Sequence, residues 1–107
     1  MASSQMENFQ LALKETSRQC GDLRSMSHET NCESATLKER VDQLALQVRQ
    51  LPPDDERAIA VSVQMAAMNG RLQALKSRQR EIAEALEYCE QQKRELQQQL
   101  DDMAAAP

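Results

Sequence analysis

Thiols are the residues of this sequence with the most specific chemistry. The chain has cysteines at positions 20, 32 and 89 and one histidine, His28. Their spacing matches neither a paired Cys-x-x-Cys metal site nor the dense cysteine framework of a small secreted protein. We therefore expect reduced cysteines, a solvated His28 and an incidental Cys32, with no metal ion and no other cofactor.

Basic side chains are the second candidate group, because the segment 71–80 carries four of them and no acid. With two more from the first half of the chain, the basic band consists of Lys38, Arg40, Arg71, Lys76, Arg78 and Arg80. Such a band suits an acidic filament such as a microtubule surface, and salt would weaken the binding. We favour the alternative of a solvated face balanced by nearby glutamates. Nucleic acid is not expected, because aromatic residues for base stacking are scarce.

The composition excludes most enzyme classes. The 107 residues include one Phe, one Tyr, no Trp and two Gly, and the net charge of -4 comes from interspersed acids and bases. Gln, Glu, Ala, Leu, Arg and Lys dominate, and these residues lose little on entering a helix. There is no Gly-rich phosphate loop and no nucleophile beside a base. We therefore predict an all-α, non-enzymatic chain with a thin apolar core.

Apolar residues recur with a heptad period on both sides of the central segment 51–57, "LPPDDER". The first half has a positions at Met6, Leu13, Cys20, Ser27, Ser34, Val41 and Val48, with d positions at Phe9, Thr16, Leu23, Thr30, Leu37, Leu44 and Leu51. The second half has a positions at Ala58, Met65, Leu72, Gln79, Leu86, Lys93 and Leu100, with d positions at Val61, Met68, Leu75, Ile82, Cys89, Leu96 and Met103. Repeats this long predict coiled-coil helices over about 5–51 and 55–104.

Two consecutive prolines separate these helices and predict a hinge at 52–54. Inside a helix, each would remove a hydrogen bond and clash with the preceding turn, costing about 3 kcal/mol. Folding the chain back about Pro52 and Pro53 fills every layer of an antiparallel hairpin, and Leu51 then faces Ala58. A kinked parallel dimer is the alternative, but it would set Lys93 against its own copy. We favour the hairpin as one domain of residues 1–107, and the ends "MASS" and "MAAAP" suggest a piece of a longer protein.

The hairpin register brings Cys20 opposite Cys89. This proximity would allow a disulfide, and hence a redox-switched hairpin. Small thiols that fill the seam in a reducing compartment are the favoured interpretation.

Apolar residues off the seam cluster beside the prolines. Leu46, Ile59 and Val63 make the helices there apolar nearly all round, which in a soluble protein indicates burial on more than one side. We therefore expect the tip of the hairpin to bind another copy or another helical protein. Scattered surface residues are the alternative interpretation.

Residues 69–101 resemble the C-terminal coiled-coil domain of the central-channel nucleoporins. The resemblance rests on an Asn-Gly before a helix with spaced glutamines and an "L-[EH]-Y-x-E-x-Q-x-x-x-L"-like run. The matching residues are Gln79, Leu86, Tyr88, Glu90, Gln92 and Leu96. The match covers less than a third of the chain, and the Phe-Gly repeats and upstream Trp of that family are absent. It implies assembly with other coiled-coil subunits in the nuclear pore.

The favoured function is a scaffold or oligomerisation module that spaces and assembles subunits of a larger complex. A microtubule- or kinetochore-associated adaptor is the alternative, and a nuclear pore subunit is the next. The sequence has neither a signal peptide nor an apolar run long enough to span a bilayer, so we expect an intracellular protein, cytoplasmic or nuclear, with no membrane partner. The adaptor function would place it on the cytoskeleton or on chromosomes.

Overall fold

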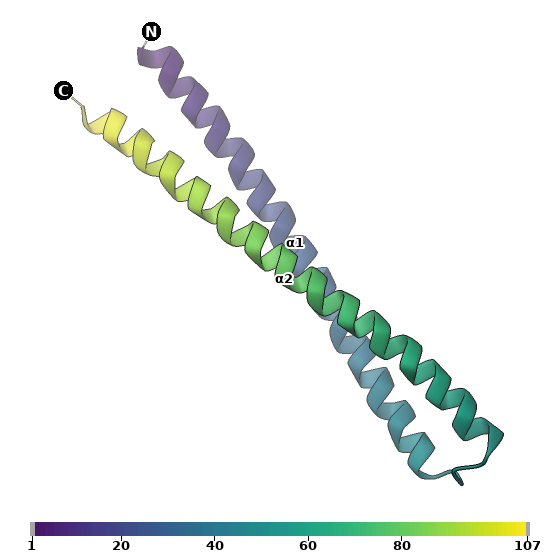
Figure 1. Cartoon of the computed structure of the whole chain (residues 1–107). Helices are drawn as coiled ribbons and strands as arrows, with labels where there is room; N and C mark the ends of the chain where they lie inside the picture. Colours follow the sequence, from purple (N-terminus) through teal and green to yellow (C-terminus); the bar gives the residue numbers. More distant parts are fainter. Residues whose placement is uncertain (1, 107) are drawn as a thin grey trace. The chain divides into compact units, whose positions relative to one another are not determined.

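The computed structural model describes residues 2–106 and consists of two long helices (Figure 1). Helix α1 runs Ala2–Arg49 and helix α2 runs Glu56–Ala105, and the described residues contain no strand. The prediction of an all-α helical hairpin is therefore confirmed. Both helices have nearly the predicted extent, although α1 begins and ends a few residues earlier than 5–51.

The heptad seam is confirmed residue by residue. Every predicted a and d position of both helices is buried or half-buried. The buried residues are Cys20, Thr30, Leu44, Ala58, Leu75, Ile82 and Cys89, and all seven belong to the predicted seam. Since the 3.5-residue repeat keeps one stripe of each helix facing its partner, the seam is the core.

The chain forms two compact units, a division that the sequence does not predict. The terminal unit consists of Met1–Ser27 with Glu81–Pro107, and the tip unit consists of His28–Arg80. Each unit contains a stretch of α1 and a stretch of α2, so each has its own portion of the seam.

Ion pairs cross between the helices in both units. In the terminal unit, Arg24 Nη2 lies 3.3 Å from Glu90 Oε1. In the tip unit, Arg71 Nη2 lies 2.7 Å from Glu33 Oε1. The first pair joins two e positions and the second joins two g positions, which is the combination that antiparallel helices bring together. All four side chains are partly exposed, so each pair contributes at most about 1 kcal/mol.

A polar layer interrupts the apolar seam of the tip unit. Thr30 is buried, and Gln79 Nε2 donates a hydrogen bond of 2.7 Å to Asn31 Oδ1. No buried side-chain nitrogen or oxygen of the described residues lacks a hydrogen-bond partner. The polar seam residues are therefore accommodated without an unsatisfied group, which would cost about 1–3 kcal/mol.

The connection between the helices spans residues 50–55, rather than the predicted 52–54. α1 closes with the Leu51 amide donating to the Val48 carbonyl, and the Asp55 amide then donates to the Pro52 carbonyl, both at 3.1 Å. Asp55 caps α2, because its Oδ1 accepts a 2.8 Å hydrogen bond from the Arg57 amide. An N-cap carboxylate satisfies an amide that the helix itself leaves unpaired.

The cap has a pH-dependent component. Hydrogen bonds from the Arg57 side chain, and then from its backbone amide, lower the pKa of Asp55. A lowered folded-state pKa adds stability above the ordinary aspartate pKa of about 3.9, and this stability is lost as pH falls through the folded value. We therefore expect Asp55→Asn to melt below the wild type at pH 7, with the gap closing in acid. Thermal unfolding followed by circular dichroism at pH 7 and at a pH below about 3.9 measures this. An equal difference in melting temperature between the two proteins at both pH values would contradict it.

Candidate functional site

The cysteine pair of the terminal unit is the most deeply buried candidate site. Cys20 and Cys89 form a disulfide with a Cα–Cα distance of 5.7 Å. Cys20 is completely buried, and Cys89 is 6% exposed. Disulfides most often have Cα–Cα distances of about 5.5–6 Å, so the backbone suits the bond. The structure thus joins the two residues that the register places opposite each other, whereas the sequence interpretation favoured separate thiols.

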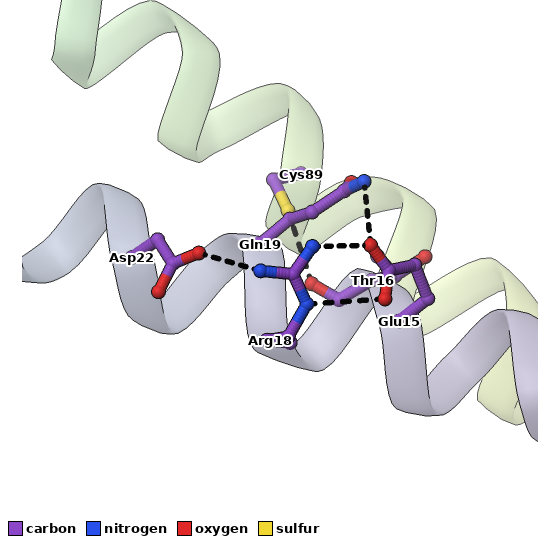
Figure 2. A network of polar contacts seen from close by, with 6 residues as sticks. All are labelled: Glu15, Thr16, Arg18, Gln19, Asp22 and Cys89. Carbon is purple, nitrogen blue, oxygen red and sulfur yellow. Dashed lines mark hydrogen bonds and ion pairs between the residues drawn. The ribbon is translucent and has the colours of Figure 1, made fainter.

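Cys89 also has a polar contact suited to the reduced state. Its Sγ lies 3.4 Å from the Thr16 carbonyl oxygen (Figure 2). A thiol can donate a weak hydrogen bond there, whereas a disulfide sulfur has no proton to donate. The same backbone can therefore accommodate the pair as thiols or as a disulfide.

A charged network covers the turn of α1 beside this pair (Figure 2). Arg18 Nε lies 3.1 Å from Glu15 Oε2, and its Nη1 lies 3.0 Å from Asp22 Oδ2. The hydrogen bond from Arg18 lowers the pKa of Glu15 and raises the pKa of Arg18 itself. All three side chains are more than half exposed, so this network stabilises the local turn weakly.

His28 and Cys32 are closer than the sequence interpretation implies. Cys32 Sγ lies 3.6 Å from His28 Nε2, and both residues are exposed on one face of α1. Their separation of four residues is the signal that could have predicted this contact, because such residues lie one turn apart. Within residues 2–106, however, no cluster of three or more His, Cys, Asp or Glu side chains is placed to hold a metal ion.

An apolar groove lies at the tip unit, where α1, the connection and α2 meet. Its lining comes from Val48, Arg49, Leu51, Pro53, Ala58, Ile59, Ser62, Val63 and Ala66. A second groove shares several of these residues and adds Ala45, Met65 and Asn69. We call the combined surface the tip groove. Ile59 is 56% exposed and Val63 is 65% exposed, so two large apolar side chains of this surface face solvent.

Only two of the three residues predicted to bind a partner line the tip groove. Ile59 and Val63 line the tip groove. Leu46 is 56% exposed but lines neither part of the groove. The sequence shows an excess of apolar residues near the prolines, but Leu46 and Val63 both occupy outer f positions. The heptad position alone therefore does not predict which of the two lines the groove.

The six residues of the basic band are exposed, but they differ in their partners. Arg71 is paired with Glu33, as described above. The other five, Lys38, Arg40, Lys76, Arg78 and Arg80, form no salt bridge with any other described residue. Their heptad positions alternate between the two sides of the seam, because Lys38 and Lys76 are at e and Arg40 and Arg78 are at g. The basic band is therefore distributed over two faces.

Comparisons with known proteins identify no relative. No family model matches the chain, and neither a curated protein nor a solved structure matches it. Over residues 2–106, neither helix has an apolar stretch sufficient to cross a membrane.

The disulfide gives a testable stability difference. It closes a long loop, because Cys20 and Cys89 are separated by 69 positions in sequence. Cross-linking a loop of this size restricts the unfolded chain and stabilises the fold by about 4 kcal/mol in the chain-entropy model. We expect reduction, or the substitution Cys20→Ser, to lower the free energy of unfolding by about this amount, seen as a lower urea concentration at the unfolding midpoint. Cys32→Ser is the matched control and should leave the midpoint unchanged, while equal midpoints for oxidised and reduced wild type would refute the stabilisation.

Proposed function

We propose that this chain is a non-enzymatic coiled-coil scaffold module that assembles with other helical chains through its tip unit. The observation that supports this function is the exposure of Ile59 and Val63 along the tip groove. Both chain ends belong to the terminal unit, so the hairpin would hold segments attached to them side by side and leave the tip unit to a partner. The apolar tip would select the partner.

The energetics of a helical pair support a partner. Two helices can bury only one stripe of side chains each, so an isolated hairpin has a small core. The tip groove adds apolar surface that the seam does not cover, and large exposed apolar patches mark interaction sites. Burying Ile59 and Val63 in an interface would contribute on the order of 1–2 kcal/mol per side chain, because each is already partly covered in the hairpin.

Light scattering of the purified chain tests this function. We expect a mass above that of the 12.1 kDa monomer for the wild type, and the monomer mass for the double variant Ile59→Asp/Val63→Asp. Leu11→Asp is the matched control, because Leu11 is 65% exposed like Val63 but lies in the terminal unit. The control should keep the wild-type mass. An unchanged mass for the double variant would disprove assembly through the tip, and a monomeric wild type would restrict that assembly to a different helical chain.

An adaptor that binds an acidic filament is the second candidate function. The five exposed basic side chains without a salt bridge support it, since they remain free to contact acidic groups. A microtubule- or kinetochore-associated role and a cytoplasmic or nuclear location would accompany this function. A nuclear pore subunit, as the resemblance of residues 69–101 implies, would instead use the assembly described above.

Co-sedimentation with microtubules separates the adaptor from a pure scaffold. If the adaptor function holds, the chain sediments with microtubules at low salt and is released at high salt, because the contacts are between exposed charges. Lys76→Glu/Arg78→Glu should abolish sedimentation. Arg71→Glu should have a smaller effect, because Arg71 already pairs with Glu33. Absence of the wild type from the pellet at low salt would eliminate this function.

A further inference from the structure

We propose that the tip groove binds a second copy of this chain, with the two tips overlapping in opposite directions. This inference rests on the proposed assembly through the tip and specifies its partner and orientation. The partner is inferred from the small side chains of the groove and from the order of charges along its edge.

The tip groove lies on one side of the seam. Ala45, Ser62 and Asn69 occupy e positions, while Arg49, Ile59 and Ala66 occupy b positions. The opposite side, with c and g positions, carries Gln43, Gln47, Gln64 and Arg57 together with Ala60 and Ala67. Ile59 lies on the groove side, whereas alanine is the largest apolar residue at the c and g positions of the tip unit, so the groove side is the better docking face.

The groove contains both large and small side chains. Ile59 and Val63 project as exposed apolar groups, and Ala45, Ser62 and Ala66 are short. Short residues let helices approach closely, so large side chains of one copy can pack over short ones of another. A surface that carries both features can pair with itself about a two-fold axis, as in most protein dimers.

Charged residues continue the face on both sides of the groove. Asp42 lies seven residues before Arg49, and Lys38 lies seven before Ala45, so both share stripes of α1 with groove residues. Asp54 and Glu56 lie at the tip itself, and all of these charged residues are exposed. Along this side of α1, moving away from the tip, the signs are therefore positive at Arg49, negative at Asp42 and positive at Lys38.

This order of signs is complementary to itself only when reversed. If a second copy lies in the opposite direction, Arg49 faces Asp42 of that copy, and Asp42 faces its Arg49. Both charge pairs are then centred between residues 45 and 46 of α1, beside Ala45 of the tip groove. At 1.5 Å per residue, Arg49 and Asp42 each lie about 5 Å from that centre along α1. Two copies in the same direction would instead bring like charges together, which disfavours that arrangement.

The charge of Arg49 provides the strongest orientation signal, although the residue is exposed in the single chain. Arg49 lines the tip groove and forms no salt bridge with another described residue. A partner that covers the groove removes water from this guanidinium, and an unpaired buried charge is strongly unfavourable. The reversed second copy supplies Asp42 at that position. An uncharged apolar helix would leave Arg49 without compensation.

Two neighbouring alanines test which side of the tip unit binds the second copy. Ala66 lines the tip groove, whereas Ala67, the next residue, lies on a c position outside it, and both are exposed on α2. Ala66→Asp and Ala67→Asp therefore change helix propensity and charge equally. By sedimentation equilibrium, we expect Ala66→Asp to weaken the dimer by at least about a hundredfold, because it buries a carboxylate. Ala67→Asp should change the dissociation constant by less than about threefold.

Charge reversal tests the orientation. We expect Asp42→Arg and Arg49→Asp each to weaken the dimer by about tenfold or more, and the double variant to restore most of the affinity. Failure of the double variant to recover would overturn the reversed arrangement. Equal changes in the dissociation constant for Ala66→Asp and Ala67→Asp would overturn the assignment of the interface to the tip groove. Both results could occur while Ile59→Asp/Val63→Asp still abolishes assembly, and the scaffold function would then stand without this interface.

Discussion

A pair of helices can bury only one stripe of side chains on each helix, and this constraint governs the whole molecule. Positions a and d are buried or half-buried throughout both helices, while nearly every other position is exposed. Residues on the seam therefore determine the fold, and residues off it are free to determine interactions. This separation explains how a Thr, a Gln and two cysteines can occupy the core of a chain whose surface holds large apolar residues such as Ile59.

The prolines determine where the chain reverses direction between the two halves of the seam. α1 ends before Pro52, because a proline has no backbone N–H to donate. The Pro52 carbonyl then accepts a hydrogen bond from the Asp55 amide. Asp55 then caps α2. The sequence predicts an acidic helix start but cannot select among Asp54, Asp55 and Glu56, since all three suit the positive end of a helix. The actual cap depends on the path of the connection.

The seam was predictable because a heptad period is a strong signal over so many repeats. The cysteine layer follows from the same register, since one pairing at the hinge determines all others. The tip groove was predictable only in part. Counting apolar residues selects Leu46 together with Ile59 and Val63, but Leu46 lines neither part of the groove although it shares the outer f position with Val63. The division into two units has no signal in the heptad pattern, which continues nearly uniformly along both helices.

The disulfide has a mechanical consequence for the fold. Tension applied between the two ends of this chain is carried along the covalent path that joins them. With Cys20 and Cys89 bonded, that path crosses directly between the helices, and residues 21–88 bear no load. The tip unit would then keep its structure under pulling forces that reach the rest of the chain. With the thiols reduced, the same force would pass through every residue and separate the helices layer by layer. The oxidation state of the cysteine pair would therefore determine how much of the hairpin can be pulled apart.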